Sequence, residues 1–243
     1  MARLGDVDRV RISGIDVLIE RKRVKNIRLR ICPPDGAVRV SAPVRAPVSA
    51  VAGLVNEKLG WIEKHRARFS QATSATDLEY VSGEVHYVRG APLTLKLEPG
   101  SDRFKVVVTG AELVLRGPVH ARTSERAAAL ERWHRAEAKR EAQRLVAQWE
   151  PRLGVAVSAL GMKRMTTRWG TCNSLARRVW LNTELIKRPP ACFEYVVVHE
   201  LAHILVADHS ARFWGVVAKH LPEYRAARAE LDRWPIWAHG RVP

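Results

Sequence analysis

The chain has 243 residues, 47% of them hydrophobic, so it is long enough to form one or two domains with a substantial core. Its 41 Lys and Arg against 25 Asp and Glu give a formal net charge of +16, which favours contact with polyanions such as nucleic acid, although a biased genomic base composition would also raise the Arg content. The three cysteines are too few and too scattered for a disulfide framework or a cysteine-based zinc site. The sequence also lacks a signal peptide and an apolar run of about 18 residues. We therefore expect a soluble cytoplasmic protein without a membrane span.

Residues 8–43 predict four short strands separated by turns. Alternating apolar and polar residues place the strands at Val10–Ile12, Val17–Glu20, Ile27–Ile31 and Val38–Ser41. In the third strand, Arg28 and Arg30 would project away from the apolar side chains between and beside them. This cationic face is either an ordinary solvated surface or a surface for polyanions or acidic substrates.

The middle of the chain predicts a helix, a linker and a second group of strands. An apolar stripe indicates an amphipathic helix over Pro47–Phe69, and residues 70–77 form a small polar linker. The second β group runs from Val85 to Leu115, and no internal repeat stands out. A long helix capped by Thr123 or Ser124 then ends by Pro151.

The C-terminal part predicts a few strands followed by helices. Strands are expected at Val155–Leu160, Lys163–Trp169 and Val179–Asn182, with a turn over 170–174. Pro189 and Pro190 precede a helix over Phe193–Ala207 that is apolar almost all round, which is typical of a helix buried on every side.

The buried helix contains the motif His199-Glu200-Leu201-Ala202-His203. Residues four apart lie on one face of a helix, so His199 and His203 can bind one metal ion together. Glu200 would lie beside the open position of that metal, where it could take a proton from bound water, as in the H-E-x-x-H zinc hydrolases. The alternative is a pair of core histidines satisfied by hydrogen bonds, and we favour the metal because unpaired polar groups are costly to bury.

Two residues compete for the place of third ligand. His209 follows the expected end of the buried helix, and a chain that turns back there could bring its imidazole over the first two. Glu223 is the competitor, because a Glu about twenty residues after the second His is the third ligand in the thermolysin type. A first-turn acid at Glu223 is also explained by the helix dipole, so we favour His209.

The motif and its surroundings resemble a known family. His199–His203 followed by His209-Ser210-Ala211-Arg212-Phe213-Trp214 resembles the YgjP-like metallopeptidase domain and, more distantly, the WLM and SprT-like proteases. Further elements resemble the same family, with Thr171 where Ser is usual: Arg168-Trp169-Gly170-Thr171-Cys172, Leu181-Asn182, Lys25–Ile31 and Val38–Pro43. The resemblance implies a zincin-type core with His199, His203 and His209 on one zinc ion and Glu200 as general base.

The expected fold is α+β, with an antiparallel β-rich N-terminal region and a zincin-like helical catalytic core that carries a small sheet. We expect the regions to be 1–120, which includes the helix over 47–69, and 121–243, or else one continuous unit. Arg177–Leu181 is a candidate edge strand for an extended substrate. Arg168 and Trp169 either line the cleft, with Arg168 stabilising oxyanion charge, or are packing residues.

The predicted function is hydrolysis of peptide bonds in a protein or peptide substrate by zinc-activated water. One alternative is a metal-dependent hydrolase of nucleotide phosphoanhydrides, although no glycine-rich phosphate loop supports it. Another is a nucleic-acid-binding protein with a structural zinc site, which three ligands and an open position argue against.

Overall fold

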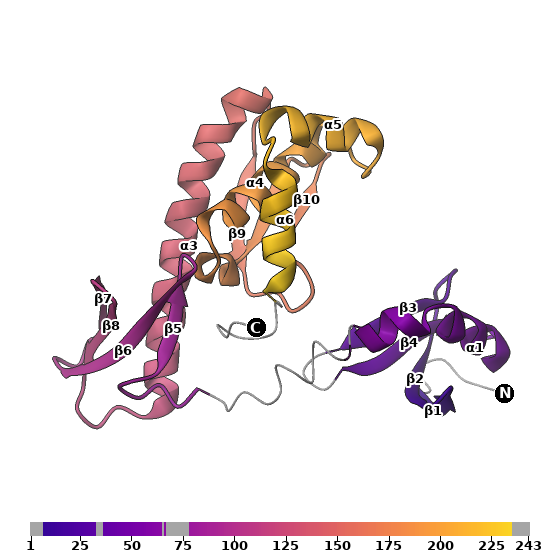
Figure 1. Ribbon diagram of the computed structural model, residues 1–243, viewed down its shortest axis with the longest axis horizontal. Coiled ribbons are helices and arrows are strands. Elements are labelled where there is room, and N and C mark those ends of the chain that lie inside the picture. The colour runs from indigo at the N-terminus through magenta and orange to yellow at the C-terminus, as the bar shows by residue number, and fades with distance from the viewer. Residues whose placement is uncertain (1–6, 33–35, 65, 67–77, 235–243) are drawn as a thin grey trace. The chain divides into compact units, whose positions relative to one another are not determined.

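The computed structural model describes residues 7–32, 36–64, 66 and 78–234. The chain divides into two compact units, Met1–Thr76 and Asp77–Pro243 (Figure 1). The sequence placed the division near residue 120 instead. The second β group belongs to the larger unit because Leu95, Leu113 and Leu115 share a hydrophobic cluster with Ala129 and Leu130 of the long helix that follows.

The N-terminal unit is a four-stranded sheet with a helix on one face. Its strands are arranged in the order β1-β2-β4-β3, with β2 and β4 parallel and the outer pairs antiparallel. Their bounds are β1 Val7–Ile12, β2 Ile15–Lys22, β3 Arg28–Cys32 and β4 Ala37–Pro43. The inward side chains of β2 and β4 pack against Val51 and Val55 of α1 (Val48–Glu57) and against Ile62.

The helix expected over 47–69 is interrupted. Lys58 is the C-cap of α1, and helical structure resumes over 59–64. Within the expected range, residues 65 and 67–69 lie outside the described part of the chain.

The larger unit begins with a second sheet of the same topology. Its order is β5-β6-β8-β7, again with a parallel central pair and antiparallel outer pairs. The bounds are β5 Val85–Val88, β6 Ala91–Pro99, β7 Lys105–Thr109 and β8 Glu112–Gly117. Both sheets open with a two-residue hairpin turn at positive φ, Ser13-Gly14 (47° and 78°) and Arg89-Gly90 (52° and 80°).

The structure therefore contains a repeat that the sequence did not reveal. Each sheet is followed by a helix, and the links to these helices share a short pattern, Ala42-Pro43-Val44 in the first copy and Gly117-Pro118-Val119 in the second. The repeat escaped sequence analysis because the copies share alternation and turn positions rather than residue identities.

Helix α3 (Thr123–Leu153) connects the second sheet to the C-terminal core (Figure 1). Its first part packs on the sheet, whereas Leu145, Val146 and Trp149 pack in the C-terminal cluster. The expected cap at Thr123 or Ser124 is wrong by one residue: Arg122 is the N-cap, and its backbone N–H donates to the Glu125 carboxylate at 2.7 Å.

The C-terminal core combines a three-stranded sheet with helices. The sheet order is β10-β11-β9, with β11 antiparallel to β10 and parallel to β9. The bounds are β9 Ala159–Lys163, β10 Gly170–Asn173, β11 Arg178–Asn182, the 3-10 helix η1 Thr183–Lys187, α4 Pro190–Leu205, α5 Ala211–His220 and α6 Tyr224–Arg233. With its three small sheets and its helices, the described chain confirms the mixed α+β class. The N-terminal β region is mixed rather than antiparallel as expected, because β2 pairs with β4, and β6 with β8, in parallel.

Four sequence expectations for this core are corrected. The strand placed at 155–160 begins only at Ala159, where β9 starts. The strand placed at 163–169 is mostly irregular, and the turn placed at 170–174 is largely β10. Residues 177–181 are not an edge, because β11 is paired on both sides. Pairing with β11 makes 170–173 a strand, a long-range effect that local propensity does not reveal.

No helix among the described residues is long and apolar enough to cross a membrane.

Candidate metal centre

Helix α4 carries two imidazoles on one face. Pro190 occupies its first turn, and apolar residues surround the helix, so it forms and is buried as its sequence predicts. One turn of helix separates His199 from His203, and their ring centroids are 4.9 Å apart. The local geometry of the helix alone is enough to bring these two rings together.

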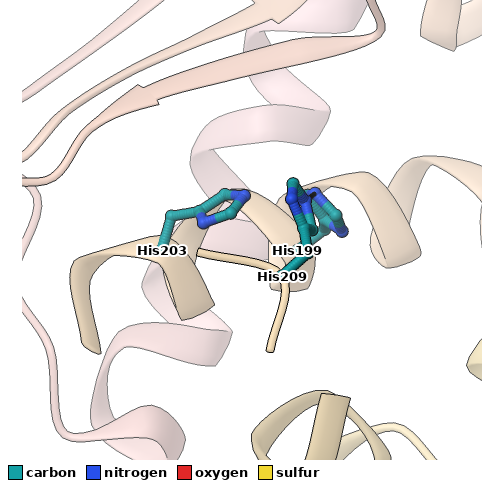
Figure 2. A group of neighbouring side chains, drawn as sticks. All are labelled: His199, His203 and His209. Atoms are coloured by element: carbon teal, nitrogen blue, oxygen red, sulfur yellow. Dashed lines mark hydrogen bonds between the residues drawn. The ribbon is translucent and has the colours of Figure 1, made fainter. Parts of the chain in front are cut away.

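The loop between α4 and α5 brings a third imidazole to the pair. A hydrogen bond from the Ser210 N–H to the Asp208 carboxylate at 3.3 Å turns the chain around His209. The Nε2 atoms of His209 and His199 are 3.0 Å apart, and the ligand atoms of all three histidines lie within 4.8 Å of one another. Figure 2 shows the three side chains converging.

Phe213 supports the three rings from α5. Its side chain is fully buried, and its ring centroid lies 4.5 Å from that of His203, 4.8 Å from that of His209 and 4.9 Å from that of His199. The sequence pattern that resembles the family contains Phe213 but does not by itself indicate this role. Its position in the first turn of the helix after His209 was the available signal.

The protonation of the histidines suits metal binding. Burial, together with the positive charge of its neighbours, lowers the pKa of His199 to about 3, and burial lowers the pKa of His203. Nδ1 of His203 lies 3.2 Å from the Val206 carbonyl, so a proton on that nitrogen leaves the lone pair of Nε2 free. Both rings can therefore offer a neutral nitrogen to a cation.

The spacing also fits zinc. Tetrahedral zinc binds imidazole nitrogens at about 2.0–2.1 Å, which places the ligand atoms about 3.4 Å apart. The observed separations, from 3.0 Å up to 4.8 Å, need only side-chain adjustments to reach this value. Three such ligands leave the fourth position for water or substrate.

Glu200 is buried next to this cluster, with 5% of its surface exposed. Burial raises the pKa of its carboxyl to about 8, and the charge of Arg168 acts in the opposite direction. The carboxylate packs against the backbone of β10: a Cβ on Gly170 would lie 2.6 Å from Oε1 of Glu200. The carboxylate therefore occupies space that a side chain at position 170 would need.

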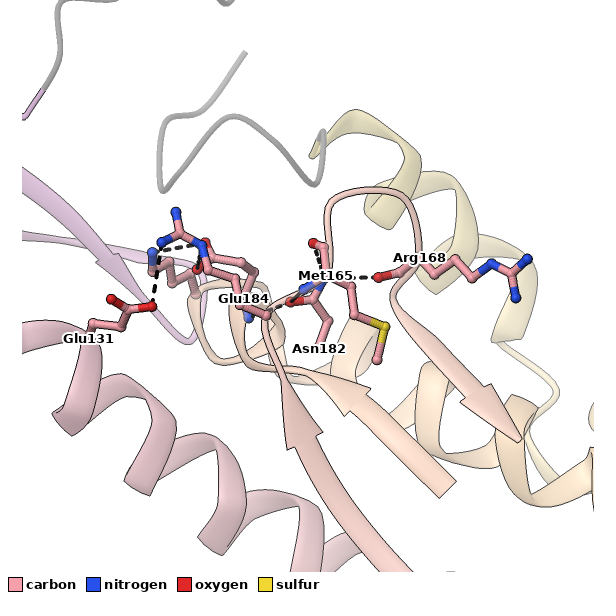
Figure 3. Close-up of polar contacts among 7 residues, drawn as sticks. Glu131, Met165, Arg168, Asn182 and Glu184 are labelled. Atoms are coloured by element: carbon pink, nitrogen blue, oxygen red, sulfur yellow. Dashed lines mark hydrogen bonds and ion pairs between the residues drawn. The ribbon is translucent and has the colours of Figure 1, made fainter. Parts of the chain in front are cut away.

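Asn182 holds the loop that leads into β10 (Figure 3). This fully buried residue donates from Nδ2 to the carbonyls of Met165 at 2.9 Å and Arg168 at 2.8 Å. Its Oδ1 accepts from the N–H groups of Met165 and Glu184, and its own N–H donates to the Trp169 carbonyl at 2.8 Å. The role of Asn182 was not predicted, although a polar residue at the end of an apolar strand is a usable signal.

The two tentative substrate residues have different surroundings. The Arg168 side chain is exposed, and its charge acts on Glu200. Trp169 is half-buried, and its ring centroid lies 5.4 Å from the guanidinium carbon of Arg188, a buried side chain that also faces Trp234 at 4.8 Å. Trp169 therefore has a clear packing contact.

Glu223 lies apart from the cluster. It is exposed and is the N-cap of α6. Within the described parts of the chain, the converging set of ligand atoms contains the three imidazoles and does not include Glu223.

Comparison with protein families places this chain among metallopeptidase domains. It belongs to the YgjP-like family: the model of the YgjP-like metallopeptidase domain matches residues 25–234, which confirms the predicted resemblance. No curated protein matches the chain. A solved structure with some likeness is the crystal structure of the metallopeptidase zymogen of Pyrococcus abyssi abylysin, with 22% identity, a TM-score of 0.33, and coverage of 38% of this chain and 90% of that one. The assignment depends on the family match alone.

Proposed function

We propose that the chain is a zinc-dependent peptidase with one ion held by His199, His203 and His209. The convergence of three imidazoles beside a buried glutamate, in a chain of a metallopeptidase family, is the observation that supports this function. When bound in such a site, zinc lowers the pKa of a water ligand to about 7 and polarises a carbonyl oxygen.

Glu200 acts as the general base. It takes a proton from the attacking water and delivers that proton to the nitrogen of the leaving amine. Its carboxylate lies against the backbone of Gly170 on β10. Arg168, whose charge reaches Glu200, is our candidate for stabilising the negative charge that develops on the carbonyl oxygen.

The substrate is an extended peptide that pairs with β10. This strand lies at the edge of its sheet, and it contacts α4 and the Glu200 carboxylate. Main-chain hydrogen bonds to Gly170–Asn173 would add the peptide as a further strand and give affinity independent of its side chains. The hydrogen bonds of Asn182 keep the approach to this strand in place.

Hydrolysis of an unfolded protein substrate by the zinc-loaded chain tests this function. We expect about one zinc per chain, loss of activity on chelation, and a fall of roughly 10²–10⁴-fold in kcat for Glu200→Gln with zinc retained. Glu223→Gln, at an exposed position outside the cluster, is the matched control. Undiminished turnover by Glu200→Gln would refute the base, full activity of the metal-free protein would refute the metal, and turnover of nucleoside triphosphates but not of protein would favour a phosphoanhydride hydrolase.

A further inference from the structure

The N-terminal sheet has one face that its own helix leaves uncovered. Side chains alternate across the strands, so the residues opposite to the apolar core share this second face. Its middle row crosses all four strands: Arg9 is paired with Leu18, Leu18 with Arg39, and Arg39 with Arg30. All three arginines of this row are exposed.

Other cations flank this row on the same face. On one side of the row, Arg11 lies opposite Asp16. On the other side, Ser41 lies between Arg28 of β3 and Glu20 of β2 and is paired with both. We define the open face by its exposed cations, Arg9, Arg11, Lys22, Arg28, Arg30 and Arg39.

Two acids neutralise only part of this charge. Asp16 pairs with Arg9 at 3.1 Å, and Glu20 pairs with Arg39 at 3.1 Å and also with Lys22. No ion pair to another described residue is formed by Arg11, Arg28 or Arg30. The face therefore keeps a surplus of four positive charges, three of them without an acidic partner in the described chain.

The exposed cations of this face differ from the buried cation of β2. Arg21, on the opposite face of β2, is a structural cation: it is 4% exposed and bonds to the Asp8 carboxylate at 3.3 Å. By contrast, Arg30 and Arg39 are like charges directly opposite each other, an arrangement that destabilises a sheet. Lys105 and Arg116 form a similar pair in the second sheet, so what distinguishes the open face is its larger surplus of positive charge.

The second sheet shows how the same topology carries a balanced face. Its outer face has three cations, Lys96, Lys105 and Arg116, against two acids. Both acids bind cations: Lys96 lies 3.3 Å from Glu98 and 3.5 Å from Glu112, and Arg116 lies 2.7 Å from Glu98. The concentration of charge is therefore particular to the N-terminal copy, where residues 1–76 hold 15 Lys and Arg against 7 Asp and Glu.

The chemistry of the open face selects its ligand. Five of its six cations are arginines, whose planar forks bind phosphate oxygens in pairs. Alternate residues on a strand are about 7 Å apart, so Arg9 and Arg11 at one edge, and Arg28 and Arg30 at the other, repeat at a distance similar to that between successive phosphates. The outward positions of the four described strands carry no aromatic side chain of the kind that a protein interface or a membrane surface uses.

We propose that this open face binds nucleic acid through its sugar-phosphate backbone, without reading base sequence. This binding site lies in the N-terminal unit and uses none of the residues of the candidate metal centre, so its failure would leave the proposed peptidase function intact. Contacts of this kind depend on displacing counterions, so their affinity falls as salt rises.

Fluorescence anisotropy of the full chain with labelled oligonucleotides of about 20 nucleotides, single-stranded and duplex, tests this proposal. We expect binding by at least one of the two forms at about 100 mM salt, equal affinity for unrelated sequences, and a linear fall of log K with log salt. The double variant Arg30→Gln/Arg39→Gln should bind at least tenfold more weakly and with a shallower salt dependence. Arg30→Lys/Arg39→Lys, which keeps the charge, should recover most of the loss.

The matched control is Lys105→Gln/Arg116→Gln, which removes the corresponding like-charge pair from β7 and β8 of the second sheet. We expect its affinity to stay within twofold of the original chain, and circular dichroism should show all variants folded. The proposal is overturned if the original chain binds neither oligonucleotide, if both Gln double variants lose affinity equally, or if polyglutamate of matched charge competes as well as nucleic acid.

Discussion

Gly170 of β10 lies directly against the carboxylate of Glu200 on α4. A Cβ at position 170 would be 2.6 Å from Oε1, 2.8 Å from Cγ and 2.9 Å from Cδ of that side chain. Real side chains do not approach so closely, so the contact exists only because residue 170 has no Cβ. The proposed general base is thereby held by the strand proposed to bind substrate.

Gly170→Ala should displace the carboxylate without removing the metal ligands. Because a misplacement of about 1 Å can cost roughly 10² in rate, we expect kcat to fall by about that factor while zinc content stays unchanged. Steady-state kinetics and metal analysis measure the two effects. Gly215→Ala, on the adjacent helix with open space at the Cβ position, is the control and should keep full activity. Equal rates for both variants would show that the contact does not position the base.

The third ligand can be identified by metal content. We expect His209→Ala to lower zinc affinity by at least tenfold, because two imidazoles on one helix cannot complete a three-ligand site. Glu223→Ala should bind zinc as the original chain does, since this residue lies outside the converging set. Titration with a chromophoric chelator gives both affinities. If Glu223→Ala weakened zinc binding and His209→Ala did not, Glu223 would be the third ligand.

Asn182→Ala should destabilise the loop before β10. The change removes four side-chain hydrogen bonds, to Met165 N and O, Arg168 O and Glu184 N, and leaves these groups unpaired. We expect a loss of about 2–4 kcal/mol in the free energy of unfolding, as measured by urea denaturation. Asn173→Ala, at the end of the neighbouring strand, removes one exposed bond to the Ala176 N–H and should cost well under 1 kcal/mol. A loss no larger than that of the control would contradict the role of Asn182.

His134 should make stability depend on pH. Burial on α3 lowers the pKa of this imidazole to about 3, and nearby Lys187 and His86 act in the same direction, whereas Glu184 opposes them. Between pH 6.5 and 3, His134 is protonated in the unfolded chain but stays neutral in the folded chain. The stabilising contribution is therefore complete above pH 6.5 and is lost as the pH falls, by at most about 1.4 kcal/mol per pH unit.

Denaturation curves of the original chain and of His134→Gln across this pH range isolate the effect. The variant should show a smaller loss of stability on acidification, whatever its stability at neutral pH. His120→Gln, at an exposed position, should leave the pH dependence as it was. If the free energy of unfolding changed with pH to the same extent in His134→Gln and in the original chain, His134 would not contribute to the pH dependence.

Several features followed from the sequence because local geometry decides them. Residues 199 and 203 are one helical turn apart wherever the helix is placed, so the motif alone brought their rings together. Alternation located the four strands of the first β group and the extent of the second, over Val85–Leu115. The surplus of positive charge was also evident, although not the row of arginines that pairing aligns across the N-terminal sheet.

Other features depend on contacts between residues far apart in the chain. Hydrogen bonding to β11 turns 170–173 into an edge strand, and the loop after α4 brings His209, rather than Glu223, to the other imidazoles. The sequence by itself determined the helix that carries His199, Glu200 and His203, because a helix imposes its spacing on every residue within it. Only the tertiary structure decided what surrounds that face, because long-range packing, and not local periodicity, selects which distant residues meet there.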